Sequence, residues 1–542
     1  MSDGWLNQWL RLGDPSFGDD FTLPLNTPIA CRATSPSRLE LAAVGKDTRV
    51  YGTFFDNNAW HGHWYRIGDT SFGDGFTLPL NTPITAISRK PGHLDLFAVG
   101  KDSAVYWTYS DNGNWIGHWY RIEDTSFADH FTLPLNTPVT AVSRFASHID
   151  LVAVGKNGVL YTTYYDDNGS WSGHWVPVSA PDFTLPLNTP ITAVSRFASH
   201  LDILAVGKDS AVYTTFYDDN GHWSAHWARL ADPRFGDGFT LPFDTPITAV
   251  SRFTSHLDVV AVGKDSAVYS TYYDDKGGWS NQWSRLGDAN FGDDFTLPVN
   301  TPIAPVVRVP SHLDLFAVGK DGAVYSTFWD DNGGWLNHWF RIGDPRFGDD
   351  FTLPVNTPIA AASRDSERID LVAVGKDSAV YSQYFGQFPG RPTIAGNEAT
   401  FNPGSLTSDL PLGGWVNVVF QENGDYTFTC HAHDSGFDNI DYVLSAVVMT
   451  QDGTAFTFQH SGSLQGTSGA LTPKRDDDPP PVSGTNQTIA KEWAGIPYAT
   501  IVASLRGTDE LVAGLEGELA SLLKEALVEV AEAGATAVIA LL

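Results

Sequence analysis

Hydrophobic and polar positions repeat along the chain in a unit of 52–56 residues. The tetrapeptide Phe-Thr-Leu-Pro marks each unit and begins at Phe21, Phe76, Phe131, Phe183, Phe239, Phe295 and Phe351. Each unit holds a β-branched stretch (TPITAVSR), an alternating stretch (HLDLFAVG), an aromatic stretch (AVYSTYY) and, in most units, a stretch with two tryptophans. Gly-Lys-Asp-Ser and Asp-Asp-Asn-Gly separate the middle stretches and are typical of hairpin turns. Each unit therefore predicts four antiparallel strands.

Seven units of four antiparallel strands predict an all-β fold, a seven-bladed β-propeller over residues 1–388. The sequence starts at a tryptophan pair, Trp5 and Trp9, whereas the last unit stops near Phe385 without one. We therefore expect the N-terminal segment to supply the outer strand of the last blade. Such a closure removes the open sheet edge that otherwise favours aggregation.

The pattern changes after residue 388. Residues 389–397 are expected to form a linker, and residues 398–505 a small antiparallel β domain with strand-like stretches such as GGWVNVVF. Residues 506–542 predict an amphipathic C-terminal helix, with Thr508 as N-cap and an apolar stripe from Leu511 to Val530. We expect this helix to pack on the β domain or on a second chain, which allows a homo-oligomer.

Composition excludes some classes of partner. The chain of 542 residues has a net charge of −30, which repels nucleic acid and anionic lipid. It has neither a run of 18 apolar residues nor a basic, apolar leader, so we expect no membrane span and no secretory signal. The protein is then cytoplasmic or released without a classical signal. Cys31 and Cys430 fall in different predicted domains, which excludes a disulfide framework.

One unit resembles the repeat of the PLL-type fucose-binding propeller lectins of bacteria. Leu201, Asp202, Gly207, Asp209 and Tyr213 carry the resemblance in the fourth unit, and it extends over roughly residues 1–388. It implies a seven-bladed ring with sugar pockets between neighbouring blades. The repeats depart from the family because Arg follows Ser where the family has Trp, and Tyr or Phe replaces most of the family's Trp-Trp pair. The resemblance therefore predicts the fold of this chain better than it predicts a preference for fucose.

Each unit also supplies planar hydrogen-bonding groups and aromatic rings, which are the groups that bind sugars. The candidate sugar-binding residues are Arg89, Arg144, Arg196, Arg252, Arg308, His93, His148, His200, His256, His312, Tyr164, Tyr217, Tyr273 and Trp329. The alternative interpretation is blade packing, in which Arg or His bridges to a repeated aspartate such as Asp202. A ring of similar shallow sites gives avidity without strong individual sites.

Two groups of residues are candidates for metal ions. The loop carboxylates Asp69, Asp74, Asp288, Asp293 and Asp294 are oxygen ligands of the kind that calcium uses, although Asp-Gly pairs are also ordinary turn residues. In the C-terminal region, His431, His433, Asp434 and His460 have the chemistry of a zinc site, and a solvent-exposed strand end is the alternative.

The sequence predicts a multivalent lectin that binds cell-surface glycans or glycoproteins, fucosylated or related, and carries a C-terminal oligomerisation or effector module. It is expected to need no cofactor and not to be an enzyme. No nucleophile elbow, P-loop or HExxH motif is present. Two alternatives stay open. One is a protein-interaction scaffold that binds no sugar, since propellers serve many functions. The other is an enzyme or metal protein that uses the C-terminal His/Asp cluster.

Overall fold

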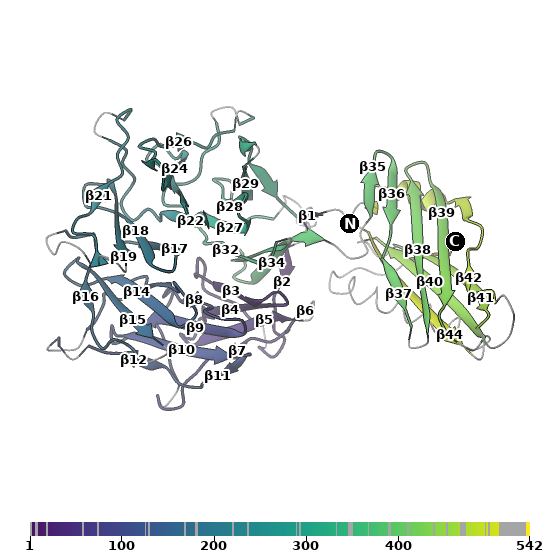
Figure 1. The fold of residues 1–542 in the computed structure, drawn as a ribbon, viewed down its shortest axis with the longest axis horizontal. Helices are drawn as coiled ribbons and strands as arrows, with labels where there is room; N and C mark the ends of the chain where they lie inside the picture. The colour runs from purple at the N-terminus through teal and green to yellow at the C-terminus, as the bar shows by residue number, and fades with distance from the viewer. Residues whose placement is uncertain are drawn as a thin grey trace. The chain divides into compact units, whose positions relative to one another are not determined.

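The computed structural model of the chain is built almost entirely of β-strands (Figure 1). It describes residues 3–508 and 538–541, apart from residues 6–8, 18–19, 57–58, 73–74, 125, 128–130, 167–169, 179–182, 219–221, 236–237, 289, 292–293, 332, 345–350, 367, 388–391, 409–410, 437–438, 451–453, 467–472, 494 and 497–498. The chain divides into two compact units, of which one is Trp5–Gly386 and the other is Gln387–Leu542 together with Met1–Gly4.

In the described part of the first unit, the strands form seven antiparallel sheets. The first three contain β3 (Ala30–Ser35), β4 (Arg38–Val44), β5 (Val50–Asp56), β6 (Ala59–Trp60) and β7 (Tyr65–Arg66); β8 (Thr85–Ile87), β9 (His93–Val99), β10 (Val105–Asp111), β11 (Asn114–Trp115) and β12 (Tyr120–Ile122); and β13 (Thr140–Val142), β14 (His148–Val154), β15 (Leu160–Asp166) and β16 (Val176–Pro177). The next three contain β17 (Thr192–Phe197), β18 (His200–Val206), β19 (Val212–Asp218), β20 (His222–Trp223) and β21 (Ala228–Arg229); β22 (Thr248–Phe253), β23 (His256–Val262), β24 (Val268–Asp274), β25 (Gly278–Trp279) and β26 (Ser284–Arg285); and β27 (Ala304–Val309), β28 (His312–Val318), β29 (Val324–Asp330), β30 (Gly334–Trp335) and β31 (Phe340–Ile342). The seventh joins β32 (Ala360–Asp365), β33 (Arg368–Val374) and β34 (Val380–Gln387) to β1 (Asp3–Trp5) and β2 (Leu10–Arg11) from the start of the chain.

The Gly-Lys-Asp-Ser hairpin between the second and third strands shows how the repeat fixes its local structure. The ring of Tyr106 lies where a side chain at Gly100 would be, 2.6 Å from the position of a Cβ atom, so only glycine fits. Asp102 accepts hydrogen bonds from the backbone of Ala104 (3.1 Å) and from the hydroxyl of Tyr106 (3.0 Å). The aspartate therefore holds the turn that the repeat predicts.

The seven sheets lie around a closed ring (Figure 1). The innermost strand of each sheet lies beside that of the next, and β32 of the last sheet lies beside β3 of the first. Val372 and Val374 of the last sheet share a buried cluster with Leu41 and Trp64 of the first. This is the arrangement of a β-propeller, in which each sheet buries both faces against its neighbours.

In six of the seven sheets, as far as the structure describes them, a repeated contact fastens the outer strand to the connection that leads into its sheet; we call it the Trp–Asp latch. In the fourth sheet the described part of this contact is the stack of Trp227 on Phe183, with centroids 4.7 Å apart. In the second sheet, the ring of Trp119 stacks on Phe76 with centroids 4.4 Å apart, and its backbone N–H donates to Asp69 (2.8 Å). The same pairs of tryptophan and aspartate recur as Trp64 with Asp14, Trp175 with Asp124, Trp283 with Asp232, Trp339 with Asp288 and Trp9 with Asp344. The latch thus joins segments about 50 residues apart in the sequence, and much further apart for Trp9.

The Trp9 latch fastens the start of the chain to the last repeat. The Trp9 ring stacks on Phe351 at 4.5 Å, its backbone N–H donates to Asp344 (2.7 Å), and the side chain is 1% exposed. Beside it, Leu10 of β2 pairs with Ser382 of β34. The N-terminal segment therefore occupies the outer position of the seventh sheet.

The second unit is a sandwich of two sheets. One sheet joins β35 (Thr393–Ala395), β36 (Glu398–Phe401), β37 (Ser405–Thr407), β38 (Leu412–Gln421), β39 (Asp425–Asp434), β42 (Asp476–Asp477) and β43 (Val482–Thr485), and the other joins β40 (Ile440–Met449), β41 (Thr454–Leu464), β44 (Thr500–Thr508) and β45 (Val538–Leu541). Phe420 of the first sheet and Phe456 of the second belong to one buried cluster. A short helix, α1 (Gln487–Lys491), adds Ile489 to this core and begins at the N-cap Asn486. Among the described residues, no helix has the length and apolar character needed to span a membrane.

Two predictions for the C-terminal region need correction. The prediction of a helix over residues 506–542 is wrong for the residues that the structure describes at its two ends. Residues 506–508 are the last residues of β44, and Val538–Leu541 forms β45, which pairs in parallel with β41. The β-branched Val538 and Ile539 suit a strand, and β41 offers them an edge to pair with. Residues 509–537, and with them the apolar stripe, lie outside the described residues. The linker predicted at 389–397 is shorter than expected, because Thr393–Ala395 pairs with β36.

Loss of the Trp9 ring is expected to destabilise the propeller. Trp9→Ala removes a fully buried ring from its stack on Phe351, and such truncations cost about 3–5 kcal/mol. Urea unfolding of the variant measures the loss. Trp119→Ala, which breaks the equivalent latch within the chain, is the matched control and is expected to cost a similar amount. A Trp9→Ala variant as stable as the wild type would contradict a closing role for the N-terminal segment.

The latch also predicts that acid destabilises the propeller. Burial acts to raise the pKa of Asp14, but hydrogen bonds from Ser16 and from the backbone of Trp64 outweigh it and lower the pKa to about 2. The pKa values of Asp69, Asp124, Asp232 and Asp288 are lowered as well. Unfolded aspartates take up protons near pH 4, so stability is expected to fall as the pH falls from about 4 to 2.

Thermal melting followed by circular dichroism across this pH range tests the expectation. The double variant Asp69→Asn, Asp288→Asn keeps an acceptor oxygen at each position and removes two titrating groups. Its melting temperature should therefore depend less steeply on pH than that of the wild type. Identical pH dependence of the two proteins would show that the latch carboxylates are not responsible.

Candidate functional site

The arginines predicted to bind sugar lie in buried ion pairs. In the fourth sheet, Arg196 sits in a β-bulge between Val194 and Phe197, and its Nε lies 2.7 Å from Oδ2 of Asp202. The two side chains are 4% and 8% exposed. The equivalent pairs, with N–O distances of 2.6–3.0 Å, are Arg89 with Asp95, Arg144 with Asp150, Arg252 with Asp258, Arg308 with Asp314 and Arg364 with Asp370. Each arginine is thus bonded to the aspartate of its own sheet.

An aromatic ring of the next sheet covers each of these arginines. The guanidinium carbon of Arg196 lies 4.5 Å from the ring centre of Tyr273, which belongs to the fifth sheet. The other pairs are Arg89 with Tyr165, Arg144 with Tyr217, Arg252 with Trp329, Arg308 with Phe385 and Arg364 with Phe55, at 4.2–5.4 Å. We call this unit of arginine, aspartate and neighbouring ring the inter-sheet clamp. Cation–π contact of this kind is strongest where water is excluded.

In two clamps the next sheet also supplies a carboxylate. Nη1 of Arg196 donates to Asp275 (2.6 Å), and Nη1 of Arg252 donates to Asp331 (2.5 Å). Burial by itself lowers the pKa of Arg196, but the hydrogen bonds and charges of Asp202 and Asp275 outweigh it and raise the pKa above its usual value. Asp275 and Asp331 remain 46% and 45% exposed. Each of these two clamps therefore holds one carboxylate at the protein surface.

Beside the clamp, three aromatic rings form a stack that we call the ring ladder. Phe197 stacks on His200 with centroids 5.2 Å apart, and His200 stacks on Phe216 at 5.3 Å. His200 is also bonded to the clamp, with Nε2 2.9 Å from Nη2 of Arg196. The third and fifth sheets have the same ladder, made of Phe145, His148 and Tyr164 and of Phe253, His256 and Tyr272.

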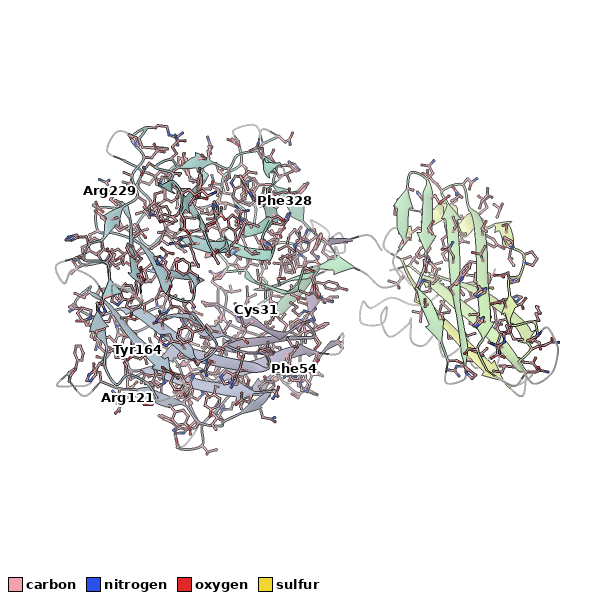
Figure 2. All side chains as sticks on the ribbon, in the orientation of Figure 1. Cys31, Phe54, Arg121, Tyr164, Arg229 and Phe328 are labelled. Carbon is pink, nitrogen blue, oxygen red and sulfur yellow. The ribbon has the colours of Figure 1, made fainter. Side chains whose placement is uncertain are left out.

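The outer rings of the ladders are exposed. Tyr164 is 49% exposed, Phe216 42% and Tyr272 48%, whereas the histidines between the rings are largely buried. Figure 2 labels Tyr164 together with Phe54 and Phe328, which take the same position in other sheets. In the first sheet the partner of the ring is an arginine, with Arg38 3.8 Å from the centre of Phe54. In the sixth sheet His312 stacks on Phe328 at 4.8 Å, and Val309 takes the position of the third ring. Within the described residues, the full ladder of three rings belongs to the third, fourth and fifth sheets.

The structure separates the predicted aromatic residues into two groups. Tyr217, Tyr273 and Trp329 cover arginines of the preceding sheet, whereas Tyr164 belongs to a ladder. Sequence reasoning missed Phe216 and Tyr272, the equivalents of Tyr164. Successive residues of a strand point to opposite faces, so alternation along the aromatic stretch was the signal that separates the two groups. Among the predicted histidines, His93 and His312 stack on one ring each in the remaining sheets.

Of the residues predicted to bind metal ions in the second unit, His431 and His433 approach the same carboxylate, Asp476, at 3.8 and 2.7 Å, whereas Asp434 and His460 have other neighbours. His431 and His433 are hydrogen-bonded to Asp478 and Asp476, each over 2.7 Å. Asp434 instead accepts from the backbone of Gly436 (2.6 Å). His460 lies 3.8 Å from Asp477. Asp477 follows Asp476 in β42, where Asp476 pairs with His433 and Asp477 with Ala432 of β39. No group of three or more histidine, cysteine or carboxylate side chains within the described residues is placed to share a metal ion.

The loop carboxylates have structural partners where they are described. Asp69 and Asp288 are latch acceptors, and Asp294 accepts from the backbone of Asp288. Asp74 and Asp293 lie outside the described residues.

Comparisons with known proteins bear on the fold of the first unit. No protein-family model and no curated protein sequence matches the chain. Among solved structures, the chain is similar to the BP39L lectin from Burkholderia pseudomallei, with a TM-score of 0.55 and 17% identity over 68% of this chain and 98% of that one. A likeness at this identity shows a shared fold. The six-bladed β-propeller lectin of Aleuria aurantia, a fucose-recognising protein, aligns with a TM-score of 0.40 and 18% identity over 59% of this chain and 96% of that one.

The clamp predicts that its arginine is needed for stability. Arg196→Ala leaves the carboxylate of Asp202 buried without its partner, which is expected to cost about 3–5 kcal/mol. Urea unfolding measures the cost. Arg285→Ala is the control, because its ion pair with Asp294 is exposed and is expected to contribute at most about 1 kcal/mol. If Arg196→Ala unfolds at the same urea concentration as the wild type, the arginine is not a clamp.

Proposed function

We propose that the chain is a multivalent carbohydrate-binding lectin whose seven-bladed propeller binds cell-surface glycans at the ring ladders. The observation that carries this proposal is an exposed aromatic ring connected to an arginine that holds a half-exposed carboxylate in place: Phe216 stacks on His200, which is bonded to Arg196, and Arg196 donates to Asp275. The shared fold with the BP39L lectin supports it. The resemblance of the repeats to PLL-type lectins makes fucosylated glycans the first ligands to test.

The ladder and the clamp supply the two kinds of contact that a sugar needs. An exposed ring face packs against the C–H groups of a pyranose, while carboxylates accept hydrogen bonds from its hydroxyls. Asp275 accepts one bond from Arg196, and a carboxylate has about four acceptor positions, so it retains capacity for hydroxyls. The arginine fixes the direction of this acceptor before the ligand arrives, which lowers the entropy cost of binding.

Repetition of the site provides avidity. Each ladder offers one ring face to a sugar, so a single ladder is expected to bind weakly. Weak individual sites on one rigid ring bind a dense glycan surface tightly, because the second contact is intramolecular. The ladders of three successive sheets, in Tyr164, Phe216 and Tyr272, are the sites that we assign to this role.

A glycan array with the intact protein, with and without calcium, tests the proposal. We expect hits among fucosylated or related glycans and no dependence on calcium. An array without any hit in either condition would contradict the lectin function and favour a protein-interaction scaffold.

Substitution of the ladder rings locates the site. The double variant Phe216→Ala, Tyr272→Ala is expected to lower the affinity for a dense glycan surface about tenfold or more, since two ladders lose their ring faces. Surface plasmon resonance on an immobilised glycoprotein measures the change. Tyr120→Ala, Phe340→Ala is the matched control, because these rings are 39% and 44% exposed on the outer strands β12 and β31. Equal losses in the two variants would place the binding site elsewhere.

A further inference from the structure

Seven apolar side chains at equivalent positions are exposed on the first unit. Each follows the proline of the Phe-Thr-Leu-Pro tetrapeptide, and each is 43–53% exposed; they are Leu25, Leu80, Leu135, Leu187, Phe243, Val299 and Val355. A side chain of this size exposed in one repeat would be ordinary, but the same exposure in every repeat is a surface feature.

Hydrogen bonds between successive repeats hold these positions on a closed ring. In every turn a threonine follows the apolar residue by two positions, and in six of the seven described turns its hydroxyl is hydrogen-bonded to the side chain of an asparagine in the turn of the next repeat. The bonds are Thr27 to Asn81, Thr82 to Asn136, Thr137 to Asn188, Thr245 to Asn300 and Thr301 to Asn356, and Thr357 to Asn26 closes the ring (2.8–3.1 Å). After Thr189 the corresponding residue of the next repeat is Asp244. The asparagines have positive φ, as in Asn26 (59°), which fixes the turn. We call the seven apolar residues the apolar annulus.

Charged side chains of both signs flank the annulus. In the hairpin tip of each sheet an exposed lysine is followed by an exposed aspartate, as in Lys46 and Asp47, except that Asn157 follows Lys156. The lysine bonds the threonine of the tetrapeptide, with Nζ of Lys46 2.9 Å from Oγ1 of Thr22. The hairpin tips thus lie against the turns of the annulus. This face carries nearly as many aspartates as lysines, although the whole chain has a net charge of −30.

The annulus and the ring ladders lie at opposite ends of the strands. In the third sheet β14 begins at His148, a member of the ladder, and ends at Val154, directly before the hairpin tip with Lys156. The backbone of Leu185, two residues before the annulus residue Leu187, donates to Gly158 in that same tip. Six residue steps along a strand span roughly 20 Å. A glycan bound at the ladders therefore leaves the annulus facing away from it.

We propose that the apolar annulus binds the annulus of a second copy of this chain, so that two propellers stack back to back. A second copy matches a circular pattern of apolar residues, and its lysines can meet the aspartates of the first copy around the rim. Each of the seven tips and turns contributes three exposed positions, an apolar residue, a lysine and an acidic or amide residue. These are about twenty residues, close to the roughly 20–30 residues per partner of a standard interface.

A bilayer fits this face less well. The strongly negative chain is repelled by anionic lipid, and the aspartates beside the lysines leave no excess of positive charge on this face. The stacked dimer places ladders on its two outer faces. It therefore bridges two glycan-bearing surfaces, a consequence that rests on the proposed function, whereas the dimer itself does not.

Multi-angle light scattering of the intact protein at micromolar concentration tests the dimer. We expect the mass of two chains for the wild type and of one chain for the triple variant Leu25→Glu, Leu80→Glu, Leu135→Glu, because like charges then meet across the interface. The matched control is Ile116→Glu, Val176→Glu, Leu336→Glu, which changes three apolar residues of similar exposure (36–47%) outside the annulus and should stay dimeric. Circular dichroism melts confirm that both variants fold.

The proposal is overturned if the wild type has the mass of one chain, or if the annulus variant keeps the mass of the wild type. Co-sedimentation with vesicles of phosphatidylcholine and phosphatidylserine tests the alternative that the annulus binds a lipid bilayer. Vesicle binding by a monomeric wild type that the annulus variant loses would assign the surface to a bilayer instead.

Agglutination of glycan-coated beads separates the two proposals. The annulus variant is expected to bind beads as the wild type does but to agglutinate them much less. If the array finds no glycan while scattering shows a dimer that depends on the annulus, the dimer stands and the bridging role is lost.

Discussion

The stack of tryptophan on phenylalanine that an aspartate fastens is the contact on which the propeller depends. A single sheet of four or five strands with two apolar faces cannot bury them alone, so each sheet needs a neighbour on both sides. In six of the seven sheets, within the described residues, the latch ties the outer strand to the connection that arrives from the preceding sheet, as Trp119 is tied to Phe76 and Asp69. Trp9 makes the same contact with Phe351 and Asp344, although Trp9 and Asp344 are 335 residues apart in the sequence. Without it the last sheet lacks its outer strand and leaves an edge unpaired.

The inter-sheet clamps place a buried charge where it contributes to stability and, in the function that we propose, to recognition. Desolvation of an arginine and an aspartate is costly, and such a pair is favourable only when its remaining donors are satisfied. Arg196 meets this condition through Asp202, His200, Asp275 and the ring of Tyr273. One consequence is that Asp275 stands at the surface in a fixed direction. The groups that join two sheets thus also prepare the surface that we assign to glycans.

The two ends of the second strand in each sheet lie on opposite faces of the ring, and these faces differ in chemistry. Rings and carboxylates gather where the second strand of each sheet begins, and apolar turns with paired charges gather where it ends. Since the second strand runs in the same direction in every repeat, each feature appears many times on one face. Repetition therefore turns a weak local property into a surface large enough to act, both for sugar rings and for association.

The sequence by itself determined the repeat, the order of strands in each unit and their hairpins, because alternation and turn residues are local properties. It predicted four strands in each unit, whereas six of the seven sheets, in the described part of the chain, have five strands, with two short outer strands paired to the same neighbour. It did not separate Tyr164 from Tyr217, because the ring that covers an arginine belongs to another sheet about 70 residues further along the chain. It grouped His460 with His431 and His433, although the structure pairs His460 with Asp477 and the other two with Asp476 and Asp478. It also predicted a helix where Val538–Leu541 pairs with β41. Only the tertiary structure decided these points, because a residue's partner across a sheet or between sheets depends on register and on closure of the ring.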